Sequence, residues 1–326
     1  MKLFLHVGPH KTGTTLIQKT MLDNQGILLQ QGLFYPKRFF RIFGHHLFRD
    51  KLLEKRLSDE DVAFLEHTGK NVLLSSEDLI SLSEEHFLYL KERLANFDIE
   101  VIYAWRRTNK KLFSIWQEYV KHGGQDTFFE YHFPHIARPA TSGMLSPDVK
   151  LNMLARVFGK PNISIIDYDA AAKADNLLDL FCKKVGLSNA STLNVPLKDK
   201  NASNKSMRFA ESELLRAFNC YFAKTSGLTG VTVRLAFNEH RERLDQQVLG
   251  ELLKIIESDA VYVNADRYFI DQRSENILKS EFASCLLNYE ENPLSHSFNI
   301  SSQKWLVDKN ASTLFETLAK QLQAFL

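Results

Sequence analysis

The hydrophobic pattern in the first half of the chain alternates between short apolar runs and longer segments with helical spacing. The apolar runs cover residues 1–7, 71–77, 99–105 and 163–168. Each run leads into polar residues or a glycine, which is typical of a buried parallel strand followed by a turn. We therefore predict four parallel strands that are joined by helices.

Apolar residues at helical spacing appear between these runs and dominate the rest of the chain. The predicted helices cover residues 15–24, 59–69, 83–96, 108–121, 149–158, 171–186, 210–223, 244–258 and 312–325. Strands that alternate with helices predict an α/β fold of three layers, with a mainly parallel central sheet flanked by helices and a helical C-terminal region. We expect a single domain over 1–326, with an α/β core at 1–190 and a mostly helical extension at 191–326.

Composition and charge narrow the class of function. The 326 residues are 44% hydrophobic, which is enough for a full core, and 41 lysines and arginines against 39 acids leave a net charge of +2. This balance argues against a nucleic-acid binder, so any anion site must be local. The chain has three cysteines, which is too few for a disulfide framework and favours a reducing compartment. Their spacing is not that of a zinc site, so we expect no bound metal. No apolar run approaches the roughly 20 residues of a membrane helix, and the first strand leaves no room for a signal peptide. We expect a cytoplasmic protein.

A glycine-containing loop follows the first apolar run and precedes the first helical segment. Residues 8–15 read Gly-Pro-His-Lys-Thr-Gly-Thr-Thr. The first N–H groups of a helix lack partners and lie at the positive end of its dipole, so such a loop is suited to hold a phosphate. The glycines have P-loop spacing, but the lysine precedes Gly13 instead of following it. A plain strand–turn–helix junction with a capping threonine is the simpler alternative. The candidate phosphate-binding residues are His10, Lys11, Thr12, Gly13, Thr14 and Thr15.

Residues 11–15 resemble the 5′-phosphosulfate loop of sulfotransferases that use 3′-phosphoadenosine 5′-phosphosulfate (PAPS). The family pattern is Lys-[Ser/Thr]-Gly-Thr-[Thr/Ser], and this sequence matches it at every place. Residues 32–36 also resemble a Gly-x-x-Tyr-Pro motif of many bacterial members. The resemblance covers roughly the first 190 residues. It implies a P-loop-like sulfotransferase fold, PAPS as cofactor with its desulfated form PAP as product, and no metal. Some relatives have a tryptophan after the two threonines; here Leu16 stands there, so base stacking must come from elsewhere.

A second pair of residues resembles the 3′-phosphate signature of the same family. Arg106 ends the third predicted strand, and Ser114 lies eight positions later on the next helix. A strand end and the first turns of the returning helix can face one phosphate, where an arginine fork and a serine hydroxyl supply donors. The spacing fits Arg106 and not its neighbour Arg107. The simpler alternative is an exposed strand-end charge and a solvated helix serine.

The resemblance implies an in-line transfer in which positioning and electrostatics contribute most of the catalysis. Lys11 is expected to meet the charge that grows on the leaving oxygen. Glu77, at a predicted strand end between the two motifs, is our first candidate for the base, since a glutamate in that interval does this work in several carbohydrate sulfotransferases. Its Ser-Ser-Glu-Asp context differs from that of the heparan-type enzymes. His45 and His46 are the rivals, because the pKa of histidine suits neutral pH.

The sequence does not identify the acceptor, and it leaves two alternative functions. The resemblance implies an acceptor hydroxyl on a small molecule or glycan, in particular a carbohydrate or glycolipid. A basic, aromatic stretch at 37–49 and an aromatic, histidine-rich stretch at 128–135 either contact the acceptor or serve the fold. One alternative is a P-loop kinase that uses ATP and magnesium, with Asp167 as a metal ligand. The other is a nucleotide-binding protein without turnover.

Overall fold

The structure of the protein, a computed structural model, describes residues 1–326 except 139–145, 189, 197–206, 265–268 and 292–296. The chain forms two compact units. The first contains Met1–Arg107, Leu145–Lys200 and Gln272–Leu294, and the second contains Thr108–Met144, Asn201–Asp271 and Ser295–Leu326. The boundaries therefore differ from a simple division at residue 190, because 108–144 groups with the later part of the chain. That the chain functions as a single domain stays a prediction.

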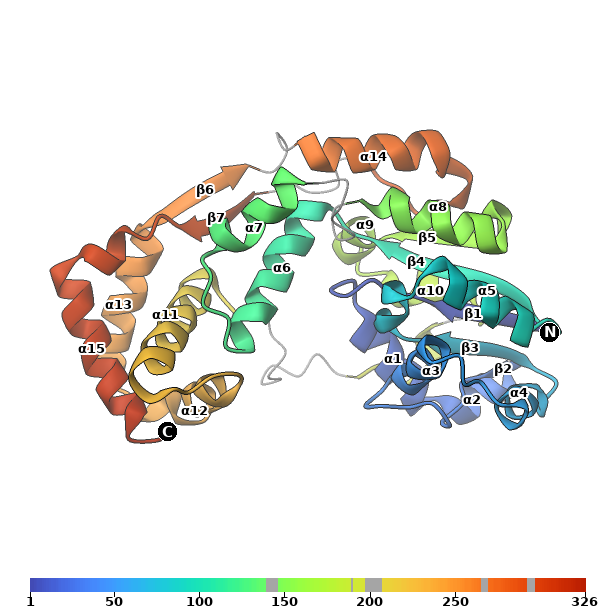
Figure 1. Ribbon diagram of the computed structural model, residues 1–326, viewed down its shortest axis with the longest axis horizontal. Helices are drawn as coiled ribbons and strands as arrows, with labels where there is room; N and C mark the ends of the chain where they lie inside the picture. Colours follow the sequence, from blue (N-terminus) through green and yellow to red (C-terminus); the bar gives the residue numbers. More distant parts are fainter. Residues whose placement is uncertain (139–145, 189, 197–206, 265–268, 292–296) are drawn as a thin grey trace. The chain divides into compact units, whose positions relative to one another are not determined.

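The first unit is built on a sheet whose described strands are all parallel, in the order β2-β3-β1-β4-β5 (Figure 1). The strands are β1 Lys2–His6, β2 Leu33–Phe34, β3 Asn71–Ser75, β4 Asp98–Trp105 and β5 Ile163–Asp167. In the register, Leu5 of β1 stands beside Leu74 of β3 and Val101 of β4. The four predicted strands are confirmed, and β2 is an addition. Because parallel strands end at one edge, the segments after β1, β3 and β4 gather there.

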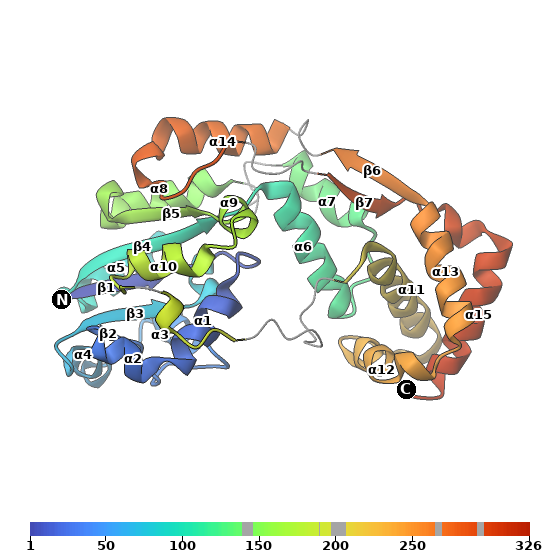
Figure 2. The same cartoon turned by 180° about the vertical axis from the view of Figure 1, so that it is seen from behind.

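Helices cover both faces of this sheet, and alternate strand residues enter two different cores. Leu3 and Leu5 enter one core, while Phe4 between them enters the other. The first face carries α3 His46–Leu53, α4 Asp59–Glu66, α5 Glu84–Arg93, α8 Pro147–Phe158 and α14 Phe269–Glu281; the other carries α1 Thr14–Asp23, α2 Gln25–Gln30, α9 Tyr168–Lys173 and α10 Leu177–Lys184 (Figure 2). The predicted three-layer α/β fold with a mainly parallel sheet is confirmed.

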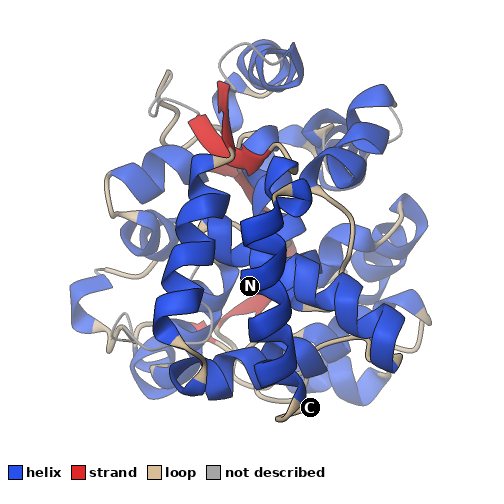
Figure 3. Ribbon diagram, turned by 90° about the vertical axis from the view of Figure 1, so that its left-hand side faces the viewer, coloured by secondary structure: helices blue, strands red, loops and turns tan. Residues whose placement is uncertain are grey.

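The second unit is mainly helical, as Figure 3 shows by its blue ribbons. It contains α6 Thr108–Lys121, α7 Phe128–Ala137, α11 Phe209–Ser226, α12 Thr232–His240, α13 Gln246–Ser258 and α15 Lys309–Gln323, with an antiparallel pair of strands, β6 Ala260–Asn264 and β7 Ser297–Ser301. Its core is aromatic, with Trp116, Phe218 and Phe237 fully buried. The helical C-terminal region is thus confirmed, and the β6–β7 pair is an addition.

Short 3-10 helices complete the described chain: η1 Glu77–Ser81, η3 Lys160–Asn162, η4 Ala190–Thr192, η5 Arg241–Arg243, η7 Ala283–Cys285 and η8 Lys304–Val307. Of these, η1 begins directly after β3, at the edge of the sheet where the loop after β1 also lies. Within the described residues, every helix is too short or too polar to cross a membrane.

Candidate functional site

The loop between β1 and α1 is tied to the neighbouring strand and to itself. The Gly8 carbonyl accepts a hydrogen bond of 2.8 Å from the Ala104 amide on β4. Within the loop, the buried Thr12 hydroxyl donates to the Pro9 carbonyl at 2.6 Å. Lys11 adopts a left-handed conformation with φ 66°, which is unusual for a residue with a side chain. The loop is therefore a fixed turn at the carboxyl end of the central strand.

Both glycines of the loop are required by close contacts as well as by positive φ. A Cβ atom on Gly13, where φ is 76°, would lie 2.4 Å from a methyl carbon of Leu177. A Cβ atom on Gly8, where φ is 81°, would lie 2.9 Å from the Cα of Glu77. A side chain at either position would force these neighbours apart. The glycines thus let the loop approach both α10 and the start of η1.

The N-terminus of α1 is open to an anion. Its N-cap residue, Gly13, has no side chain to accept from the first-turn amides, and the structure shows no side-chain cap. The alternative of a capping threonine is not what is observed, because the Thr12 hydroxyl bonds Pro9 instead. Thr14 is buried and Thr15 is exposed at this helix end. Uncapped amides and the positive end of the helix dipole together favour a bound phosphate or sulfate group.

Arg106 lies against this loop within the same unit. Its Nη1 donates a hydrogen bond of 2.8 Å to the carbonyl of Lys11, and its guanidinium carbon lies 5.3 Å from the centre of the Tyr168 ring. Its Nε is buried, lies 3.8 Å from a carboxylate oxygen of Asp169, and has no hydrogen-bond partner among the described residues. A buried donor without a hydrogen-bond partner is rare in folded proteins, so this nitrogen is a candidate contact for a bound group.

Ser114, the other residue of the expected 3′-phosphate signature, lies on α6 in the second unit. Arg106 belongs to the first unit, so the pairing of the two residues around one phosphate stays a prediction.

Glu77 occupies the first position of η1, directly beside the loop. Its backbone is the contact that excludes a side chain from Gly8. Its carboxylate accepts a hydrogen bond of 2.7 Å from the amide of Gln18 on α1. The structure therefore places this carboxylate at the same sheet edge as Lys11, where the sequence predicted it, and shows Gln18 as a partner that the sequence did not indicate.

His45 is fully buried, and its ring is used by the fold. Its Nδ1 accepts a hydrogen bond of 3.0 Å from the Ser75 amide, and its Nε2 lies 2.9 Å from the Pro36 carbonyl, to which it donates. The ring packs edge-on against Tyr35 at 4.6 Å. Burial lowers the pKa of His45 to about 3. With both nitrogens engaged and no exposure, this environment argues against His45 as a catalytic base and favours a structural role.

His46 has a different environment, because Asp78 faces its ring. The Nδ1 of His46 lies 2.7 Å from Oδ2 of Asp78 and 3.0 Å from the Ser76 hydroxyl. The other carboxylate oxygen of Asp78 lies 3.3 Å from Nε2 of His10, the loop residue before Lys11. Asp78 therefore joins the loop to His46. Sequence reasoning missed Asp78, although it directly follows Glu77 in the Ser-Ser-Glu-Asp segment.

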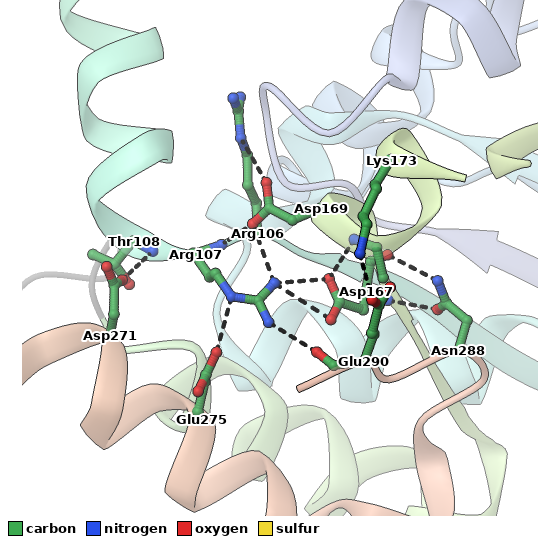
Figure 4. Close-up of polar contacts among 11 residues, drawn as sticks. Arg106, Arg107, Thr108, Asp167, Asp169, Lys173, Asp271, Glu275, Asn288 and Glu290 are labelled. Atoms are coloured by element: carbon green, nitrogen blue, oxygen red, sulfur yellow. Dashed lines mark hydrogen bonds and ion pairs between the residues drawn. The ribbon is translucent and has the colours of Figure 1, made fainter. Parts of the chain in front are cut away.

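Arg107, next to Arg106, is fully buried in an ionic cluster (Figure 4). Its Nε donates to Glu275 at 2.9 Å, and its Nη1 lies 3.2 Å from Asp167. The Asp169 carboxylate accepts from the Arg107 amide at 2.9 Å, and the carbonyl of Glu290 accepts from its Nη2 at 3.2 Å. These ion pairs connect the end of β4 to β5 and α14, and each buried charge in the cluster has a partner of opposite sign.

Asp167, the residue considered as a magnesium ligand, belongs to this cluster. Its carboxylate pairs with Arg107 and caps α9 by accepting from the Ala170 amide at 3.1 Å. Burial raises the pKa of Asp167. Its oxygens therefore already have partners, which weakens the kinase interpretation. Across the described residues, no group of three or more His, Cys, Asp or Glu side chains has the arrangement of a metal site.

The two segments considered for acceptor contact are partly used by the fold. In the basic stretch, Arg38 pairs with Asp61 at 2.7 Å and Arg49 with Asp50 at 2.9 Å. The aromatic stretch forms most of α7. On this helix Phe128 is buried, whereas Phe129 and Phe133 are 53% and 67% exposed, respectively. Each segment thus has a structural side and an exposed side.

Comparison with known proteins gives little beyond this geometry. No protein-family model and no curated protein matches the chain. Among solved structures, the crystal structure of a sulfotransferase from Alicyclobacillus acidocaldarius is similar at 15% sequence identity and a TM-score of 0.40, over 69% of this chain and 93% of that chain.

Proposed function

We propose that the protein transfers a sulfuryl group from PAPS to an acceptor hydroxyl by in-line displacement. The observation that carries the proposal is the loop with its uncapped helix end, because its sequence matches the 5′-phosphosulfate pattern and its backbone amides are open to an anion. The Nε of Arg106 faces Asp169 at 3.8 Å but makes no hydrogen bond among the described residues, which supports a second contact to the nucleotide beside the loop. When bound, PAPS supplies the activated sulfuryl group.

In this proposal the loop holds the 5′ end of the nucleotide. The amides of Gly13, Thr14 and Thr15 and the hydroxyls of Thr14 and Thr15 would hold the 5′-phosphate, and the Lys11 ammonium would stabilise negative charge on the oxygen that joins it to the sulfuryl group. Arg106 would bind the 3′-phosphate, the group that distinguishes PAPS from ATP, and the sequence signature predicts Ser114 as a second ligand of this phosphate.

A base must take the proton of the acceptor hydroxyl, and two of the three candidates keep a suitable environment. Glu77 and His46 lie at the sheet edge beside the loop, whereas His45 is buried with both nitrogens engaged. His46 is favoured over Glu77, because Asp78 orients its ring and can stabilise the imidazolium that forms. We infer a carbohydrate or glycolipid as acceptor, in line with the resemblance of the motifs.

Calorimetry with three ligands tests the nucleotide part of the proposal. The protein is expected to bind PAP more tightly than AMP, which lacks the 3′-phosphate, and to bind ATP with magnesium weakly. Preference for ATP with magnesium would establish the kinase alternative instead.

Turnover of PAPS by the Lys11→Ala variant tests the catalytic part. Removing one positioned donor is expected to lower the rate roughly 100- to 1,000-fold. Lys19→Ala serves as the control and should keep wild-type turnover, because Lys19 is an exposed lysine on α1, the helix that follows the loop. Tight PAP binding by the wild type without any transfer would indicate a non-catalytic nucleotide-binding protein.

A further inference from the structure

We propose that Arg106 is a positioning residue for the 5′-phosphate loop as well as a phosphate ligand, so that one guanidinium couples the two anion contacts. This inference rests on the proposed function for the identity of the ligands. The contact that suggests the positioning role needs no ligand: Arg106 donates a hydrogen bond of 2.8 Å to the loop backbone.

The loop needs such support at Lys11. A lysine at φ 66° is in a conformation that residues with side chains rarely adopt, so surrounding contacts must maintain it. The bond from Arg106 reaches the carbonyl of Lys11 itself, and the donor is charged, which makes the bond stronger than one between neutral groups. The side chain therefore restrains the residue whose ammonium is proposed to act in transfer.

Arg106 is itself held in place by α9. The Tyr168 ring lies 5.3 Å from the guanidinium carbon, and the Asp169 carboxylate lies 3.8 Å from Nε. The same tyrosine ring lies 3.2 Å from the position that a Cβ of Gly13 would occupy. Tyr168 thus contacts both Arg106 and the helix end of the loop, and the loop, Arg106 and α9 form one packed group.

The guanidinium still has a donor for a ligand. Its Nη1 is used by Lys11, but its buried Nε has no hydrogen-bond partner among the described residues. An anion that satisfies this donor also fixes the side chain that restrains Lys11. Binding at the 3′ side should therefore favour the loop conformation that binds the 5′ side, and loss of Arg106 should weaken both.

Hydrogen exchange of the nucleotide-free protein tests the restraint directly. The amides of Ala104 and Ile17 donate to the loop carbonyls of Gly8 and Gly13, so their exchange reports the stability of the loop. In Arg106→Ala these two amides are expected to exchange at least about tenfold faster than in the wild type, since one charge-assisted bond to the loop is lost. Lys173→Ala is the matched control, because Lys173 is a cation at the other end of α9 and pairs with Glu290. It should leave the exchange of both amides unchanged.

Calorimetry with AMP and PAP then separates the two roles of Arg106. If Arg106 restrains the loop, Arg106→Ala weakens binding of AMP as well as PAP, each by about 10- to 100-fold. Arg106→Lys keeps the charge but not the fork, so AMP binding should stay weakened several-fold, and this variant also serves if Arg106→Ala fails to fold.

Two results would overturn the proposal. The first is wild-type exchange of the Ala104 and Ile17 amides in Arg106→Ala. The second is loss of PAP affinity alone with AMP affinity kept, which would make Arg106 a 3′-phosphate contact and nothing more. A wild-type protein that binds neither AMP nor PAP would refute the proposed function instead, and the exchange experiment would still decide whether Arg106 restrains the loop.

Discussion

The choice of His46 over Glu77 as the base leads to a prediction about Asp78. A carboxylate only accepts hydrogen bonds, so the 2.7 Å contact with Asp78 places the hydrogen of neutral His46 on Nδ1. The lone pair then lies on Nε2, which is the nitrogen able to take a proton from the acceptor. Asp78→Asn removes the charge that fixes this arrangement while keeping the size of the side chain.

The expected magnitudes follow from the contacts. General-base catalysis contributes about 100- to 10,000-fold, so His46→Gln should lower the turnover number by that range. Asp78→Asn loses a charged hydrogen bond to the imidazolium, about 1.5–3 kcal/mol, which corresponds to roughly 10- to 100-fold in rate. Asp78→Glu should recover part of the loss. His46→Gln should not change PAP affinity by more than a few-fold, because His46 makes no contact with the loop that the structure shows, whereas Asp78 also contacts His10 of the loop.

Sulfuryl transfer from PAPS to p-nitrophenyl glycosides, as probe acceptors, provides the assay, with PAP affinity measured separately. His67→Gln is the control, because His67 is an exposed histidine of the same unit whose ring contacts the Phe64 carbonyl. Nitrogen NMR of His46 gives a readout without acceptor: the wild type should carry its hydrogen on Nδ1. Wild-type turnover in His46→Gln together with inactive Glu77→Gln would refute the assignment.

Three further predictions concern the loop and the core. Gly13→Ala should abolish PAP binding and destabilise the fold by about 1–3 kcal/mol in urea unfolding, whereas Gly69→Ala, also at positive φ but with nothing within 4 Å, should cost only about 1 kcal/mol. Arg107→Met leaves buried carboxylates without a counter-charge and should destabilise by about 3–5 kcal/mol in the same assay. Burial lowers the pKa of His6 to about 4 and that of His45 to about 3, so folding stability should fall as the pH drops from about 6.5 toward 4; an unchanged urea midpoint between pH 7 and 5 would contradict this.

The parallel sheet could be predicted because each strand is a continuous apolar run between polar residues. β2 could not, because it contains only Leu33 and Phe34 and forms by pairing with β3. The β6–β7 pair was missed for a related reason. Its strands are far apart in the sequence, and in β6 Val261 and Tyr262 are both exposed, so no buried alternation marks it.

The loop could be located from sequence because its chemistry is contiguous, whereas its partners depend on strand pairing. Asp78 comes close to the loop because β3, which precedes it, pairs with β1. Gln18 reaches Glu77 because it lies on α1, the helix that follows the loop. His45 and His46 show the limit most directly. They are adjacent, yet one is enclosed by backbone groups and the other faces a carboxylate, because α3 begins between them.

The two arginines that follow β4 are also adjacent in the sequence, yet we expect them to affect different properties of the protein, namely its stability and its nucleotide affinity. Arg106 and Arg107 directly follow β4 and enter different environments: Arg106 donates to the Lys11 carbonyl, whereas Arg107 pairs with Glu275. The charge partners of Arg107 lie 60 to 168 residues later in the chain, and no local pattern reveals them. Substitutions should therefore separate the pair: Arg107→Met should lower the urea midpoint, whereas Arg106→Ala should lower nucleotide affinity with little effect on that midpoint. A similar loss of stability in both variants would show that the structure assigns the two guanidinium groups wrongly.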